Sequence, residues 1–178
     1  NNSANSVLSI RKEGNTPAWG AVYEQYFQEI DKVKGQKGVL SVEKKLFVET
    51  NNGTNRQIRP VTPEQPLRIG DKVIVRLTIR TDREMNYVFL KDLRAGCFEP
   101  ADQLSGPESR DGIWYYRSPK DVSENFFINR LPEGTFVLEY PVYVSRSGEY
   151  AGGISTIQCM YAPEFVSHTA GESLRIMP

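Results

Sequence analysis

The clearest structural signal in the sequence is Asp71-Lys-Val-Ile-Val-Arg-Leu-Thr-Ile-Arg80. Val73, Val75, Leu77 and Ile79 fall on one face of this stretch if it is extended, and mostly polar residues fall on the other. A period of two predicts a β-strand that buries one face and exposes the other. This stretch therefore predicts a sheet with one face turned toward a core.

Strand patterns continue on the C-terminal side of Pro66, where short alternating runs are separated by Gly, Pro, Asp and Asn. Further strands are predicted at 86–90, 113–117, 125–129, 135–145, 154–160 and 172–176. Turn chemistry lies between them at Leu131-Pro-Glu-Gly134 and Ser145-Arg-Ser-Gly148. About seven short strands with such turns are typical of an all-β, antiparallel, immunoglobulin-like sandwich.

The register of this sandwich can be predicted residue by residue. The side chains expected to face inward are those of Val73, Val75, Leu77, Phe127, Val137 and Ile157. Pro132 pre-sets a turn and Gly134 supplies a positive φ, so Leu131-Pro-Glu-Gly134 is interpreted as a hairpin turn between residues 126–128 and 136–138.

The first 37 residues are ambiguous by pattern. Apolar residues from Trp19 to Ile30 follow helical spacing, whereas their aromatic and β-branched content favours a strand. A strand is expected again at 39–50, followed by a polar turn or exposed loop at 51–55. We place a domain boundary near Gly38. Residues 1–37 have too few apolar positions for a core of their own, so we expect them to be less stable than the sandwich.

Composition limits the classes of function. Hydrophobic residues make up 39% of the 178 residues and charged residues 25%, as in folded soluble domains. The 22 Lys and Arg balance 22 Asp and Glu, which argues against a nucleic-acid partner. The sequence has no apolar run long enough for a transmembrane helix. Asn52-Gly-Thr54 fits a glycosylation sequon, a pattern that often arises by chance.

The residues that could carry chemistry give no recognisable catalytic set. His168 is the only histidine and has no nucleophile motif, so it is interpreted as a surface loop residue. Cys97 and Cys159 match no metal or redox spacing; two buried thiols are favoured over a disulfide, but both alternatives stay open.

Carboxylates are numerous, and any acid–base pair among Asp92, Glu99, Asp111 and Glu164 is explained by chance. The glycines of Gly148-Glu-Tyr-Ala-Gly-Gly153 are interpreted as turn and strand formers rather than a phosphate loop. The run Ile113-Trp-Tyr-Tyr116 is interpreted as half core and half surface, although it could also stack on a ligand. We therefore predict no catalytic residue, no cofactor-binding residue and no metal ligand.

Several motifs in a fixed order carry a resemblance to a known family. They are Leu67-Arg-Ile-Gly-Asp-Lys-Val-Ile-Val-Arg-Leu77, Val88-Phe-Leu-Lys-Asp-Leu-Arg-Ala-Gly-Cys-Phe-Glu-Pro100, Asn125-Phe-Phe127, Leu131-Pro-Glu-Gly-Thr-Phe-Val-Leu-Glu-Tyr140, Gly148-Glu-Tyr150 and Met160-Tyr-Ala-Pro-Glu164. Together they resemble the C-terminal macroglobulin-type domain of bacterial alpha-2-macroglobulin-like proteins, over about residues 38 to 178. One departure is Arg94-Ala-Gly-Cys97, where the family often has Pro-Ala-Gly-Phe.

The resemblance also interprets the N-terminal part. Pro17-Ala-Trp-Gly-Ala-Val-Tyr-Glu-Gln25 is similar to the stretch after the thioester-type helical domain of that family. Residues 1–37 are then the end of a preceding β-rich segment, residues 38–178 are the C-terminal sandwich, and a strand rather than a helix is expected at 19–30. The family's Cys-x-Glu-Gln thioester motif does not occur in the sequence.

The resemblance implies a non-catalytic structural or interaction domain of an exported bacterial protein similar to endopeptidase inhibitors that trap proteases. The expected partners are other domains of the same longer chain, and proteases through the parent protein. A dimer formed through an open edge is also expected. The implied location is the periplasm or cell envelope, with a lipid anchor on the missing N-terminal part. A free-standing adhesion or carbohydrate-binding sandwich is the alternative.

Overall fold

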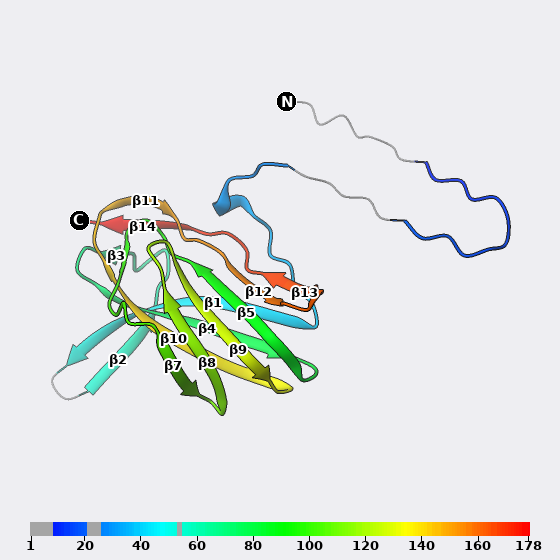
Figure 1. Ribbon diagram of the computed structural model, residues 1–178. Helices are drawn as coiled ribbons and strands as arrows, with labels where there is room; N and C mark the ends of the chain where they lie inside the picture. The colour runs from blue at the N-terminus through cyan, green and yellow to red at the C-terminus, as the bar shows by residue number, and fades with distance from the viewer. Residues whose placement is uncertain (1–8, 21–25, 53–54) are drawn as a thin grey trace.

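The computed structural model describes residues 9–20, 26–52 and 55–178, with side chains for all of these except 51, 52, 55 and 56. Figure 1 shows an all-β body, and residues 9–20 lie outside it. The body is a β-sandwich whose two large sheets contribute side chains to one core. The predicted fold class is confirmed.

Three sheets build this body. The five-stranded sheet contains, in spatial order, β2 (Asn55–Pro60), β1 (Leu40–Asn52), β4 (Lys72–Thr81), β10 (Gly134–Val144) and β6 (Phe98–Pro100). The six-stranded sheet contains β13 (Ala162–His168), β12 (Ser155–Cys159), β5 (Met85–Leu93), β9 (Ser123–Leu131), β8 (Ile113–Pro119) and β7 (Gly106–Arg110). A small third sheet contains β11 (Gly148–Ala151), β14 (Ser173–Met177) and β3 (Leu67–Arg68), and the β14–β3 pair is the parallel one.

The register prediction is confirmed in four positions and wrong in two. Val73, Val75, Leu77 and Ile157 are all buried in the core, as predicted. Phe127, however, is 39% exposed and its neighbour Phe126 is buried, because Phe126 shares the inner face with Ile128. Because the two phenylalanines are adjacent and equally apolar, the alternation of residues does not show which of them faces the core.

Val137 is the second wrong position. It is half-buried on the outer side of β10, whereas the inner side carries an unbroken row of buried apolar residues. This row consists of Phe136, Leu138, Tyr140, Val142 and Val144. Period-two alternation allows one set inside, and the larger apolar set takes that face.

The turn Leu131-Pro-Glu-Gly134 has a different role from the predicted hairpin. β9 pairs with β5 and β8, whereas β10 pairs with β4 and β6. A hairpin joins two strands that bond to each other, so this turn instead carries the chain from one sheet to the other. Gly134 has the expected positive φ, at 139°.

The N-terminal part forms little regular structure where it is described. Residues 9–20 are exposed throughout, residues 26–29 contain neither strand nor α-helix, and the 3-10 helix η1 (Ile30–Lys32) follows. The strand expected at 19–30 is therefore not formed at 19, 20 or 26–29, and residues 21–25 lie outside the described residues. An extended segment needs a bonded neighbour to become a strand, and these residues run through solvent.

Candidate functional site

The outer surface of the six-stranded sheet carries a row of aromatic side chains. Tyr116 of β8 lies opposite Phe127 of β9, and Phe127 lies opposite Phe89 of β5. The Phe89 and Phe127 rings stack with centroids 4.9 Å apart. Cross-strand aromatic pairs stabilise a sheet, but here the rings are left partly in water.

The run from Ile113 to Tyr116 is divided between core and surface, as predicted. Ile113 and Tyr115 are buried, whereas Trp114 is 70% exposed and Tyr116 is 47% exposed. Beside them lies a hollow of about 520 Å³ that also involves Phe127.

A second aromatic group lies at the end of β5 and at the β12–β13 turn. Tyr87 and Tyr161 meet edge to face with ring centroids 5.1 Å apart. Tyr161 is 79% exposed and Met160 is also exposed. Tyr87 has φ 56°, an irregular backbone that interrupts the β5 alternation so that Asn86 and Tyr87 are both exposed.

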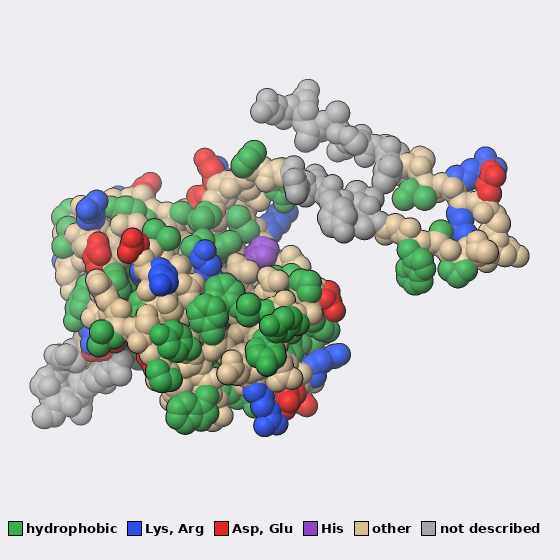
Figure 2. Space-filling view, viewed as in Figure 1, with side chains coloured by type: hydrophobic (Ala, Val, Ile, Leu, Met, Phe, Trp, Pro, Cys, Tyr) green, Lys and Arg blue, Asp and Glu red, His purple; other side chains and the backbone are tan. Residues whose placement is uncertain are grey.

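We define the aromatic face as the outward side chains of these strands and of the β12–β13 turn. It comprises Tyr87, Phe89, Trp114, Tyr116, Phe127, Met160 and Tyr161. Figure 2 shows hydrophobic side chains gathered over the part of the body where β5, β8 and β9 lie. Exposed apolar side chains that gather on one surface mark a binding site more often than scattered ones do.

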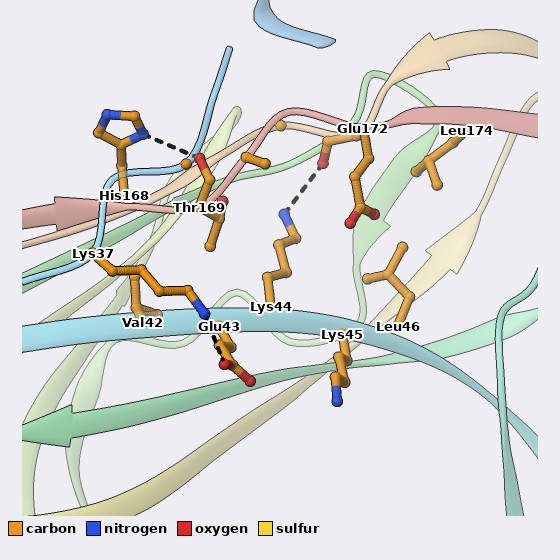
Figure 3. Close-up of a pocket in the computed structure, with 14 residues that line it drawn as sticks. Lys37, Val42, Glu43, Lys44, Lys45, Leu46, His168, Thr169, Glu172 and Leu174 are labelled. Atoms are coloured by element: carbon orange, nitrogen blue, oxygen red, sulfur yellow. Dashed lines mark hydrogen bonds and ion pairs between the residues drawn. The ribbon is translucent and has the colours of Figure 1, made fainter. Parts of the chain in front are cut away.

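A groove runs along the inner side of β1. Two adjoining cavities of about 560 and 1020 Å³ share Lys44 and Leu46 on one wall and Glu172 and Leu174 on the other. Figure 3 shows Lys44 and Leu46 pointing toward the segment of Glu172 and Leu174, while Lys45 points away. β2 pairs with β1 only from Phe47 onward, and the Val61 N–H donates to the Leu46 carbonyl, so in the described part β4 is the strand that pairs with β1 along 40–45.

Asp92 connects the two large sheets. It is fully buried on β5, and its Oδ1 accepts hydrogen bonds from Lys44 Nζ at 2.8 Å and Ser155 Oγ at 2.7 Å. Its Oδ2 accepts the hydroxyl of Tyr140, whose pKa is raised well above its usual value by burial and by the charge of Asp92. Lys44 Nζ also donates to the carbonyls of Leu93 and Gly152. Asp92 and Lys44 thus form a buried ion pair in which each balances the charge of the other.

A second buried ionic cluster lies next to it. Glu124, opposite Asp92 in the β5–β9 register, accepts bonds from Arg117 Nε at 2.8 Å and Arg94 Nη1 at 3.2 Å. Burial raises the pKa of Glu124, and the charges of Arg117 and Arg94 oppose that rise. Both arginines keep one buried nitrogen without a partner, Arg94 Nε and Arg117 Nη2. This cluster was not predicted from the sequence, because charged residues within a strand pattern indicate its solvent-exposed face.

The other candidate carboxylates do not converge with Asp92. Glu99 is exposed on β6 and Glu164 on β13, while Asp111 is in the β7–β8 turn, where it accepts the Val137 N–H. Among the residues that the structure describes, no group of three or more His, Cys, Asp or Glu side chains is arranged to hold a metal ion.

His168 is not the surface loop residue that we expected. It ends β13, is half-buried, and its Nδ1 lies 3.1 Å from the carbonyl of Thr169. The β13 strand was not predicted, because Pro163 and the polar residues before Gly171 suggested a loop. The favoured interpretation of the cysteines is confirmed: Cys97 and Cys159 are buried free thiols, and burial raises the pKa of Cys97 to about 11.

Two further sequence signals can be placed. Gly148 begins β11, and Gly153 has φ 74°, so these glycines shape a strand start and a turn as predicted. Part of the sequon at 52–54 lies outside the described residues. Within the described ranges, no helix is long and apolar enough to span a membrane.

Comparison with known proteins identifies the fold and the family. The chain is similar to the crystal structure of Salmonella alpha-2-macroglobulin reacted with methylamine, with 21% identity and a TM-score of 0.63 over 82% of this chain and 10% of that one. It is also similar to Escherichia coli alpha-2-macroglobulin spanning domain MG7 to the C-terminus, with 16% identity and a TM-score of 0.62 over 81% and 24% of the two chains. Both likenesses show the shared fold.

A curated relative, Circularly permutated Ras protein 2 of Dictyostelium discoideum, is 28% identical over 109 residues, which are 61% of this chain and 3% of that protein. This chain thus spans a small part of the proteins that it matches. The model of the bacterial alpha-2-macroglobulin MG10 domain matches residues 40–164. The chain belongs to this bacterial alpha-2-macroglobulin MG10 domain family.

Proposed function

We propose that this protein is a non-catalytic interaction domain that docks through its aromatic face onto another domain of a longer alpha-2-macroglobulin-like chain. In this proposal residues 38–178 are the docking unit, and residues 1–37 are the end of the preceding segment. The parent is an exported bacterial inhibitor that traps endopeptidases, located in the periplasm or cell envelope.

The observation that carries the proposal is the exposure of the aromatic face. Trp114 and Tyr161 are 70% and 79% exposed, and they belong to one group with the stacked pair Phe89 and Phe127. Burying aromatic side chains of this size against a partner gains about 1.5 to 3 kcal/mol each for a full burial. Aromatic residues and Met are also the types enriched in protein interfaces.

The pairing of the buried charged groups in the described part of the chain supports a structural role for them, and hence a binding role for the domain. The buried carboxylates Asp92 and Glu124 are each held by basic side chains of the same core. His168 has no cysteine or serine hydrogen bond to its ring in the described structure. Asp92 and Glu124 stabilise the sandwich and line neither cavity of the groove along β1, so they are not placed as an acid and a base would need to be.

Hydroxyl-radical footprinting tests the proposed docking. The purified chain and its full-length parent are labelled in parallel, and oxidation of Trp114, Met160 and Tyr161 is measured by mass spectrometry. We expect strong labelling in the isolated chain and at least a fivefold reduction in the parent. Tyr143 is the matched control, because it is 45% exposed on the outer side of the other large sheet. Equal labelling of the aromatic face in both proteins would contradict the proposal.

A panel of endopeptidases tests the inhibitory part of the proposal. The isolated chain is expected to leave their activity unchanged, and the parent is expected to block cleavage of large substrates. Inhibition by the isolated chain would overturn its assignment as a module without inhibitory activity of its own.

A carbohydrate-binding or adhesion module is the second candidate. It is favoured by the exposed Trp114 and Tyr116 beside the hollow of about 520 Å³, because flat aromatic side chains stack on apolar faces of ligands. A glycan array separates the two candidates. Binding that is lost in Trp114→Ala, with the fold retained, would favour this second function over domain docking.

A further inference from the structure

A short segment before the first strand is attached to the sandwich by hydrogen bonds. Gln36 and His168 exchange two backbone bonds, with N to O distances of 2.9 and 3.0 Å, and the Gly171 N–H donates to the Val33 carbonyl at 2.8 Å. Ser173 Oγ donates to Asp31 Oδ2 at 3.1 Å. Residues 30–37, which we name the strap, thus lie along the connection between β13 and β14.

The strap contributes almost nothing to the core. η1 has no buried residue, Ile30 is 38% exposed, and the residues from Val33 to Gly38 are exposed or half-exposed. A typical net contribution is about 1 kcal/mol for each hydrogen bond. Detaching the strap therefore costs only a few kcal/mol, which is less than unfolding a domain, and it can occur as a local opening.

The strap fits in one position because two glycines allow a close backbone approach. A Cβ atom on Gly171 would lie 1.8 Å from the Ile30 carbonyl oxygen and 2.8 Å from the Asp31 Cα. A Cβ on Gly35 would lie 3.0 Å from the Ala170 nitrogen. These contacts involve backbone atoms, so a side chain at Gly171 and the seated strap exclude each other.

The strap also forms one wall of the groove along β1. Gly35 and Lys37 line the smaller cavity together with His168, Thr169 and Ala170. Lys37 Nζ reaches Glu43 of β1 at 3.3 Å, as Figure 3 shows. If the strap leaves, the groove loses this wall and the β13 edge loses its partner at His168.

We propose that residues 30–37 are a detachable strap that couples the position of the upstream residues to the opening of the groove along β1. With the strap seated, the groove is closed on one side and the end of the β13 edge is paired. A displacement of residues 26–29, which directly precede the strap, pulls on it. The strap then detaches while the sandwich stays folded.

Hydrogen exchange on the complete chain measures the opening. The amides of Gln36, His168 and Gly171 are expected to exchange at least a hundredfold faster than those of Val75 and Leu77, with rates insensitive to low urea as for local opening. Equal protection of the two groups would mean that the strap and the sandwich open together, and would overturn the proposal.

Gly171→Ala tests the fit of the strap. We expect the amides of Gln36 and His168 to lose at least tenfold in protection while β4 amides keep theirs. Gly106→Ala is the matched control, because a Cβ there meets no atom within 4 Å. Ser173→Ala removes the bond to Asp31 without a clash, and a smaller loss at the same amides is expected. Unchanged exchange in both Gly171→Ala and Ser173→Ala would contradict the proposal.

A thiol probe tests the coupling to the groove. Val42 is buried on β1 and lines the groove, and the native thiols are buried. Alkylation of Val42→Cys is expected to be at least tenfold faster when it is combined with Gly171→Ala than when combined with Gly106→Ala. If the strap amides lose protection while alkylation stays constant, the strap detaches but does not close the groove.

Discussion

The outer surfaces of the two large sheets differ in chemistry although both cover the same core. On the five-stranded sheet, Arg76 donates to Glu139 at 2.6 Å and lies 4.5 Å above the Phe47 ring centroid. Lys72 and Glu49 form another ion pair there, at 2.9 Å. The six-stranded sheet instead exposes the aromatic face. The charged side chains of the first surface pair with one another, whereas the aromatic side chains of the second remain exposed to water, as they often do at binding sites.

The largest expected effect concerns the core that both sheets share. Asp92→Ala leaves the Lys44 ammonium, whose side chain is 10% exposed, without its counter-charge. Removing one partner of a buried pair costs about 3 to 5 kcal/mol, and the free energy of unfolding from urea titration measures it. Asp82→Ala, which breaks an exposed pair with Arg83, is the control and should stay within about 0.5 kcal/mol. A small effect of Asp92→Ala would mean that the two sheets do not depend on this ionic link.

Phe126 and Phe127 allow the buried and the exposed face of the six-stranded sheet to be compared within one strand. Phe126→Ala should lower the free energy of unfolding by about 3 to 5 kcal/mol, because this side chain is buried in the core. Phe127→Ala should cost about 1 kcal/mol, since the ring is 39% exposed and stacks only on the outer surface. Equal costs would contradict the assigned register of β9.

Sequence reasoning predicted the features that depend on local alternation. The sequence of β4 shows which of its faces is buried, since Val73, Val75 and Leu77 alternate with neighbours that are mostly polar. Phe126 and Phe127 do not, because two equal residues in adjacent positions fit either register. The sheet-crossing role of Leu131-Pro-Glu-Gly134 was missed for a related reason: turn chemistry fixes the backbone locally but does not identify the strands that pair.

The candidate site was less predictable from sequence than the fold. Trp114 is exposed because it alternates with the buried Ile113 and Tyr115, and the run from Ile113 to Tyr116 was predicted to be half core and half surface. The grouping of Trp114 with Tyr87 and Tyr161 depends on long-range strand order, which the sequence alone does not contain. Short strands such as β3 and β6 have too few residues for a period-two signal.

The charged outer surface predicts a smaller, pH-dependent effect. Burial alone would raise the pKa of Glu139, but the hydrogen bond from Arg76 and the charge of Arg110 hold this pKa below its usual value. A carboxylate with a lowered folded-state pKa adds stability above its unfolded pKa of about 4.3, and that stability is lost as pH falls through the lower folded value. We expect Glu139→Gln to lower the free energy of unfolding by about 1 kcal/mol at pH 7, and by less below pH 4. Urea titrations of both proteins from pH 7 to pH 3 give this difference, and a constant difference would exclude the ionic origin.

The smallest stability effect is expected on the aromatic face. Trp114→Ser removes a side chain that is 70% exposed, so the free energy of unfolding should change by less than about 0.5 kcal/mol. The same substitution should reduce binding of the isolated chain to the upstream domains of its parent at least tenfold, measured by calorimetry. Tyr143→Ser on the five-stranded sheet is the control, with no expected effect on this binding. If both substitutions weaken binding equally, the two sheet surfaces do not differ in function. The difference between the charged and the aromatic surface would then have no bearing on docking.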